Sequence, residues 1–121
     1  MKPTEIIVAD AQSNGIDPQN TLNYVSDAIQ NRNGVLVKKN NSVLLLTPIA
    51  QNIAEWNLFT QDTGSDLIDS VNYFIDEVRK TDIAIVYGMV DNLETLQLVN
   101  DLGLRVVQSD DPEYQWMAEV Q

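Results

Sequence analysis

Residues 61–66, with the sequence Gln-Asp-Thr-Gly-Ser-Asp, stand between a predicted strand and a predicted amphipathic helix. The N–H groups in the first turn of a helix have no partner within the helix, so a turn that contains a Gly at this place can bind an anionic ligand. The segment therefore predicts an anion-binding turn at the start of a helix.

Two acidic residues in the same turn, Asp62 and Asp66, oppose that chemistry. Like charges ~4 Å apart repel by ~4 kcal/mol at an effective dielectric constant of 20. An exposed helix N-terminus attracts an anion by only ~0.3–1 kcal/mol. No Lys or Arg lies between Lys39 and Arg79 to offset the repulsion. In the alternative interpretation, both acids only cap the helix and complement its dipole, and Asp66 can also point away from a ligand.

The elements that position this turn are predicted by hydrophobic periodicity. A strand is expected over residues 53–60 and an apolar central strand over residues 83–87, parallel to a neighbour. Between them, apolar residues fall on one face of a helix over residues 67–78. These residues are Leu67, Ile68, Val71, Phe74, Ile75 and Val78.

The rest of the chain supplies further alternating elements. We expect a first strand at residues 6–9, a helix opened by Asp17 and Pro18, and a hairpin around residues 38–42, with Pro48 interrupting or ending its second strand. A helix after residues 91–92 ends at Gly103, and strands at 104–107 and 114–117 close the fold. The order β-α-β-β-β-α-β-α-β-β predicts an α/β protein with a mixed sheet flanked by helices.

The amino-acid composition excludes some classes of function and disfavours others. The 121 residues predict one domain, 1–121, with no signal peptide and no apolar run of the ~18–20 residues that span a membrane. Cys and His are absent, which excludes disulfides and thiolate or His-based catalysis and predicts no metal site. A net charge of −11 disfavours direct binding to nucleic acid or acidic membranes and permits a basic protein partner. The charge can also serve solubility alone.

The strand, the turn with Gln61 and Gly64, and the segment from Tyr87 through Asn92 to Gly103 together resemble the GNAT acyltransferase family. The resemblance implies that Gln61, Gly64, Ser65 and Asn92 hold acetyl-coenzyme A, and that Glu55 on the preceding strand acts as general base. Two positions depart from the family pattern. Asp66 replaces the last small residue of the turn, and Val99 stands where a Tyr often protonates the departing thiolate. Tyr87 and Tyr114 are unaligned phenols.

These departures lead to three hypotheses. In the first, the chain is an acetyltransferase-like protein with weak or lost catalysis, no bound cofactor and a role in interaction with a protein partner. Its brevity and missing Tyr are similar to small GNAT-like proteins of short-tailed bacteriophages, which implies a place in the host cytoplasm or the virion. In the second, it is an active acetyl-coenzyme A-dependent N-acyltransferase of an amine. In the third, it is an acidic decoy of a nucleic-acid-binding protein. The sequence indicates no oligomeric state.

Overall fold

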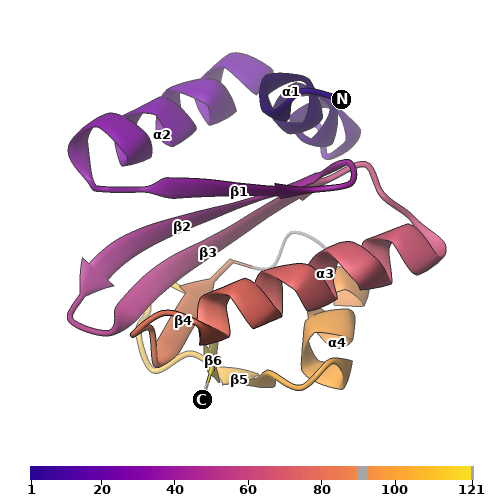
Figure 1. Ribbon diagram of the computed structural model, residues 1–121. Helices are drawn as coiled ribbons and strands as arrows, with labels where there is room; N and C mark the ends of the chain where they lie inside the picture. The colour runs from indigo at the N-terminus through magenta and orange to yellow at the C-terminus, as the bar shows by residue number, and fades with distance from the viewer. Residues whose placement is uncertain (90–92, 121) are drawn as a thin grey trace.

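The computed structural model describes residues 1–89 and 93–120. A six-stranded mixed sheet separates two pairs of helices, with α1 and α2 on one face and α3 and α4 on the other (Figure 1). The predicted α/β class, a mixed sheet flanked by helices, is confirmed. The observed order is α-α-β-β-β-α-β-α-β-β, so the expectation for the first element is wrong.

That first element is helix α1, Pro3–Ser13, where a strand was expected at residues 6–9. Ile6 and Ile7 are buried on its inner side, against the sheet and α2. Pro3 occupies the first turn, and the Glu5 carboxylate accepts a hydrogen bond from the Lys2 backbone N–H at 2.8 Å. A run of four apolar residues fits a strand or a helix equally, and here the residues before it favour a helix start.

Helix α2, Pro18–Asn31, begins as predicted. The Asp17 carboxylate accepts a hydrogen bond from the Gln19 backbone N–H at 2.9 Å. Its buried residues Val25 and Ala28 join α1 and the inward residues of β2 and β3 in one apolar cluster. None of the described helices is long and apolar enough to cross a membrane.

The strand order is β1-β2-β3-β4-β6-β5. Strands β1 (Val35–Lys39), β2 (Ser42–Ala50) and β3 (Ile53–Thr60) form an antiparallel meander. Asn40 has φ +51°, as a tight hairpin between β1 and β2 requires. Strand β4 (Ile85–Gly88) pairs parallel with β3 and antiparallel with β6 (Trp116–Glu119), which also pairs with the edge strand β5 (Arg105–Gln108).

Pro48 interrupts β2 without ending it, which is one of the two expected outcomes. The register of β2 against β3 shifts between Pro48 and Ala50, and the strand continues to Ala50. Strand β1 pairs with β2 only as far as Leu46. Past that point β2 has no neighbour on the β1 side, so the missing N–H of Pro48 leaves no β1 carbonyl without its partner.

Helix α3, Gly64–Arg79, carries the predicted apolar face except at Ile68, which is exposed. Val71, Phe74, Ile75 and Val78 are fully buried, and they pack with Trp56 of β3 in the larger core cluster. Helix α4, Leu93–Asp101, ends before Gly103, which has φ +113° as a helix C-terminus favours. The capping box predicted for its start includes residues 91 and 92, which lie outside the described part of the chain.

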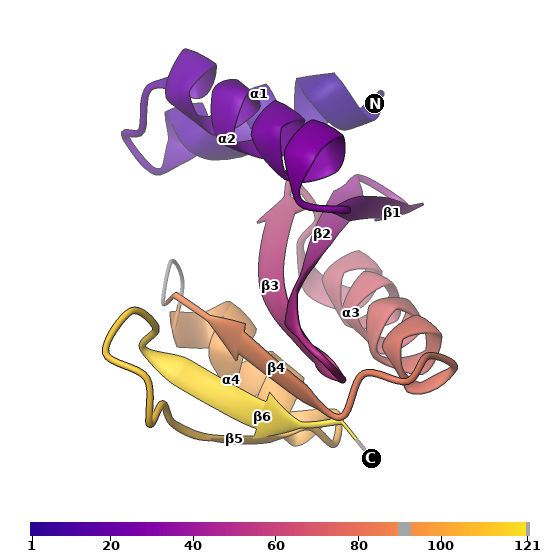
Figure 2. The same ribbon diagram turned by 90° about the vertical axis from the view of Figure 1, so that its left-hand side faces the viewer.

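Strands β3 and β4 pair over only three residue pairs, Ile53 with Ile85, Ala54 with Val86 and Glu55 with Tyr87. Beyond these pairs, β3 runs on to Thr60 while β4 turns away. Figure 2 shows the two strands side by side near the C-terminus and apart at their arrowheads. We call this divergence the splay. The strand predicted over residues 53–60 is confirmed, and the strand predicted over residues 83–87 is found as β4, Ile85–Gly88, parallel to it.

Candidate functional site

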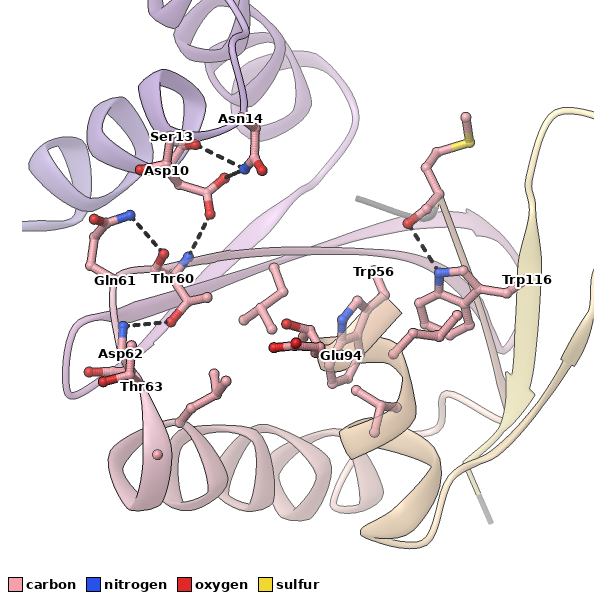
Figure 3. Close-up of a pocket in the computed structure, with 17 residues that line it drawn as sticks. Asp10, Ser13, Asn14, Trp56, Thr60, Gln61, Asp62, Thr63, Glu94 and Trp116 are labelled. Atoms are coloured by element: carbon pink, nitrogen blue, oxygen red, sulfur yellow. Dashed lines mark hydrogen bonds between the residues drawn. The ribbon is translucent and has the colours of Figure 1, made fainter. Parts of the chain in front are cut away.

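A cavity of about 380 Å³ lies at the splay. Its walls come from the end of α1, the second half of β3, the turn into α3, the first turns of α4, and Trp116 of β6. Trp56 and Trp116 meet edge to face, with ring centroids 6.5 Å apart. Leu58, Leu67 and Val99 supply further apolar wall. The cavity therefore has a mixed lining of apolar and polar side chains around the open end of a strand pair (Figure 3).

The predicted anion-binding turn lies on one wall of the cavity. Gly64 lines it with φ +55°, and an added Cβ would meet no atom within 4 Å. Gln61 also lines the cavity, but its side-chain amide donates to the Thr60 carbonyl oxygen at 2.8 Å. Ser65 is exposed and stands outside the described lining. The structure thus brings Gln61 and Gly64 to the cavity and leaves Ser65 beside it.

Asp62 is the buried acid of the turn, with 8% of its surface exposed. Its carboxylate accepts hydrogen bonds from the Asn41 backbone N–H at 3.1 Å, the Ser42 hydroxyl at 2.6 Å and the Ser70 hydroxyl at 2.8 Å. Its own backbone N–H donates to the Thr60 hydroxyl at 2.9 Å. Asp62 therefore joins β2, the end of β3 and α3 beside the cavity.

Asp66, which the sequence singled out as the main obstacle to an anion, is exposed and stands outside the described lining. The acids that do line the cavity are Asp10, Asp62 and Glu94. Figure 3 shows Asp10 on α1 and Glu94 on α4, on different walls. No Lys or Arg occurs among the described lining residues. The electrostatic argument against an anion therefore shifts from Asp66 to these three carboxylates.

Glu55, the candidate base, is buried, with 7% of its surface exposed. Its carboxylate accepts hydrogen bonds from the Asn57 side-chain amide at 2.7 Å and from the Tyr114 hydroxyl at 2.7 Å. It lines a second, shallower space of about 280 Å³, which we call the hollow, together with Tyr24, Asn57, Met89, Glu113 and Tyr114. Glu55 is therefore not an outward-facing acid exposed to solvent.

The two unaligned phenols both donate to carboxylates. The Tyr87 hydroxyl donates to Asp110 at 2.7 Å, and the two tyrosine ring centroids are 5.3 Å apart. Burial, followed by the hydrogen bond to Glu55, raises the pKa of Tyr114 strongly. The hydrogen bond to Asp110, followed by burial, raises the pKa of Tyr87. Each phenol therefore holds its proton more firmly than a free Tyr.

Asn92 lies outside the described residues, so its predicted contact with a cofactor stays a prediction. Val99, which replaces the expected Tyr, is buried and lines the cavity. Position 99 therefore lies at the cavity, where the resemblance implies that acyl transfer takes place. Its valine side chain cannot donate a proton.

The fold has counterparts among solved structures. Tetrahymena GCN5 matches over 98% of this chain and 86% of its own, with a TM-score of 0.62 and 14% identity. A GNAT-family acetyltransferase from Staphylococcus aureus matches over 98% and 93%, also with a TM-score of 0.62 and 14% identity. The chain has the GNAT fold.

A third GNAT-fold match is the ribosomal-protein-S18-alanine N-acetyltransferase of Escherichia coli, with a TM-score of 0.53 and 14% identity over 98% of this chain and 86% of that one. No protein-family model and no curated protein sequence matches the chain. At this identity the likeness establishes the GNAT fold, and the activity has to be argued from the site.

Sequence reasoning missed Asp10 and Glu94 as cavity residues. Asp10 belongs to the helix that was predicted as a strand, so its position on a wall had no basis. Glu94 was interpreted only as part of a capping box. The sequence holds one local signal that Glu94 lines the cavity. Glu94 lies in the first turn of α4, close after Asn92, which was predicted to bind the cofactor.

Proposed function

We propose that this GNAT-fold protein is acetyltransferase-like in structure but weak or inactive in catalysis, and that it works by binding another molecule. The observation that carries the proposal is the acidic cavity lining, Asp10, Asp62 and Glu94, without a basic residue among the described lining residues. Two unit charges ~4 Å apart repel by ~1 kcal/mol in water and ~4 kcal/mol at an effective dielectric constant of 20. The diphosphate of coenzyme A is disfavoured in such a cavity.

The second support is the lack of a proton donor at position 99. A thiolate leaving group needs a proton or a positive environment, and Val99 offers neither. The phenols of Tyr87 and Tyr114 donate to carboxylates and hold their protons firmly.

Calorimetric titration with acetyl-coenzyme A tests this proposal. At ~0.1 mM ligand we expect no measurable binding to the wild type, because a weak site remains mostly empty. Neutralising two lining acids together, Glu94→Gln with Asp10→Asn, removes most of the repulsion and should improve affinity by about tenfold or more, since ~1.4 kcal/mol is one factor of ten.

Asp66→Asn is the matched control, because it removes an acid of the turn that is exposed and outside the described lining. It should leave the affinity for acetyl-coenzyme A unchanged within about twofold, as distant exposed charges are screened. Tight binding by the wild type, with release of free thiol when an amine is added, would overturn the proposal.

That outcome would favour the second candidate, an N-acyltransferase. One observation supports it, the burial of Glu55 at the hollow. A buried carboxylate that faces an open space can take a proton from an amine. In that case Gln61, Gly64, Ser65 and Asn92 would hold acetyl-coenzyme A, and Glu55→Gln should abolish thiol release while leaving cofactor affinity intact.

For the binding role we propose a basic protein partner, met in the cytoplasm of an infected host cell or in a phage particle. The net charge of −11 supports the choice of a basic partner. The phage setting rests on the resemblance to small phage proteins. Steering by opposite charge raises association rates by ~10–10³-fold and weakens with salt, so a salt-dependent association rate is the expected signature.

A further inference from the structure

The sheet has two outer edges, at β1 and at β5, and the direction of their main-chain groups follows from the strand pairing. The Gln61 N–H donates to the Asn41 carbonyl oxygen at 2.9 Å, in register with the β2–β3 ladder. In an antiparallel ladder, successive residues direct their main-chain groups to opposite sides. Over residues 42–47, the odd-numbered residues of β2 therefore bond to β3 and the even-numbered ones to β1. The main-chain groups of Leu36 and Lys38 then face outward from β1.

The edge at β5 is partly closed. The Ser109 N–H donates to the Gln115 carbonyl oxygen at 3.3 Å, in register with the β5–β6 ladder, so the main-chain groups of Val106 and Gln108 face outward. The Val106 N–H donates to the side-chain oxygen of Asn100 at 3.2 Å. At β1, the outward N–H and carbonyl groups have no hydrogen-bond partner among the described residues. The fold therefore caps one outer edge and leaves the other open.

The open edge of β1 is complementary to a second copy of itself. When two β1 strands lie antiparallel with Val37 opposite Val37 of the second copy, Leu36 of each strand lies opposite Lys38 of the other. Residues paired in this way exchange both of their N–H···O=C hydrogen bonds, so all the outward groups of both strands find partners. Two copies related by a two-fold axis present the same surface to each other, as this pairing requires.

The side chains of β1 avoid like-charge contacts in this arrangement. Lys38 lies opposite Leu36 of the second copy. Lys39 lies opposite Val35 of the second copy, where its methylene stem covers an apolar side chain that is 58% exposed. A Lys on an edge strand often prevents pairing. Here, however, the Lys38 Nζ donates to the Asn40 carbonyl oxygen at 2.7 Å and lies along its own hairpin.

The charge around β1 differs from that of the rest of the chain. Residues 28–54 contain no Asp or Glu, and they include both β1 and β2. Two acids from outside this segment face its basic residues, with the Asp27 carboxylate 3.1 Å from the Arg32 Nε and the Asp69 carboxylate 3.9 Å from the Lys39 Nζ. The repulsion between two copies that each carry −11 therefore acts mainly over longer distances, where salt screens it.

We propose that the β1 edge is a docking surface for a second copy of this chain, and that the two copies join antiparallel at β1 in one continuous sheet. Figure 2 shows β1 at the margin of the sheet, with α2 on one side and α3 on the other. No residue of β1 or β2 is among the described residues that line the cavity. The inference is therefore independent of the proposed function, and either can fail without the other.

Sedimentation velocity over protein concentrations from ~1 µM to ~1 mM tests for the dimer, because small interfaces give weak complexes. We expect reversible association. Raising the salt concentration from ~0.01 M to ~0.15 M shortens the screening length from ~30 Å to ~8 Å and should strengthen the association, because it weakens the repulsion between two acidic copies. A basic partner shows the opposite salt dependence. A protein that remains monomeric up to ~1 mM overturns the proposal.

Proline variants test the main-chain pairing. Lys38→Pro removes an outward N–H and no hydrogen bond within the sheet, so the fold should tolerate it while the dimer weakens by about tenfold or more. Gln108→Pro makes the same change at the β5 edge and should leave the association unchanged within about twofold. Equal weakening by Gln108→Pro, or by Lys38→Ala, which keeps the N–H, would overturn the pairing.

Charge variants test the register without changing the main chain. Val35→Lys places a cation opposite Lys39 of the second copy, whereas Val35→Glu places an anion there. The Glu variant should associate about tenfold more tightly than the Lys variant. General repulsion between acidic copies predicts the opposite order, and that order would overturn the register. Val107→Lys on β5, at a position 44% exposed, is the matched control and should leave the association unchanged.

Amide hydrogen exchange, measured by nuclear magnetic resonance in dilute and concentrated protein, locates the interface. The N–H groups of Leu36 and Lys38 should exchange about tenfold more slowly in the concentrated sample, because only the dimer gives them partners. The N–H of Val37 bonds to β2 in both states, and that of Gln108 faces away from the interface, so neither should depend on concentration to this extent. Unchanged exchange at Leu36 and Lys38 in a sample that is dimeric would overturn the proposal.

Discussion

Two buried carboxylates lie at the two ends of β3, and they have different kinds of partners. Asp62, just past the strand's end, accepts from a backbone N–H and from the short hydroxyls of Ser42 and Ser70. Glu55, near the strand's start, accepts from the longer side chains of Asn57 and Tyr114 and adjoins the hollow. Main-chain and short hydroxyl donors are fixed by the fold, while longer side chains can turn away. Asp62 is therefore a structural acid, and Glu55 is one that a ligand can reach.

The largest effect is expected for Asp62→Ala. The change leaves the Asn41 N–H and two hydroxyls without their acceptor in a buried place, and it should lower the free energy of unfolding by about 3 kcal/mol. Urea denaturation followed by circular dichroism measures the loss. A loss below about 1 kcal/mol would mean that the hydroxyls find new partners easily, and the contrast with Glu55 would disappear.

A smaller effect is expected for Tyr114→Phe, which removes one of the two donors to Glu55 but keeps the ring. We expect a loss of about 1–2 kcal/mol near neutral pH. Tyr87→Phe is the matched control, because it removes the corresponding bond to Asp110 and leaves Glu55 unchanged.

The same variant has a pH signature. The pKa of Tyr114 is raised in the folded protein, so above pH ~10 the unfolded chain loses the phenol proton while the folded protein keeps it. Stability should therefore fall as the pH rises beyond ~10, and it should fall less steeply in Tyr114→Phe. Equal slopes between pH ~9 and ~11 would show that burial and Glu55 do not raise the pKa of Tyr114.

Local sequence patterns predicted the elements whose apolar pattern extends over many residues. They missed the contacts between residues that are far apart in the sequence. Helix α3 has six apolar positions on one face, whereas residues 6–9 are too few to distinguish a strand from α1. Gln61 and Gly64 could be assigned to the turn before α3 because they directly follow a strand, while their role as ligands stays a prediction. The partners of the two carboxylates could not be predicted. Tyr114 is 59 residues from Glu55, and Asn41 is 21 residues from Asp62.

The smallest effect is expected for Asp66→Ala, which sharpens the contrast with Asp62 within a single turn. Asp66 is exposed and acts only through the dipole of α3, worth ~0.3–1 kcal/mol. Its loss should be within that range by urea denaturation and should shrink further in 1 M salt. A loss as large as that of Asp62→Ala would show that burial does not separate the two acids.

The short pairing between β3 and β4, the seam of the sheet, affects how the two halves of the sheet can move relative to each other. It divides the sheet into two leaves, β1-β2-β3 and β4-β6-β5, whose strand pairing across the seam covers three residue pairs. Within the leaves the pairing is longer, with eight register pairs between β2 and β3. The larger core cluster packs side chains of both leaves against α3, and Trp56 meets Trp116 across the seam. A change of angle between the leaves therefore strains few sheet hydrogen bonds and is resisted mainly by this packing.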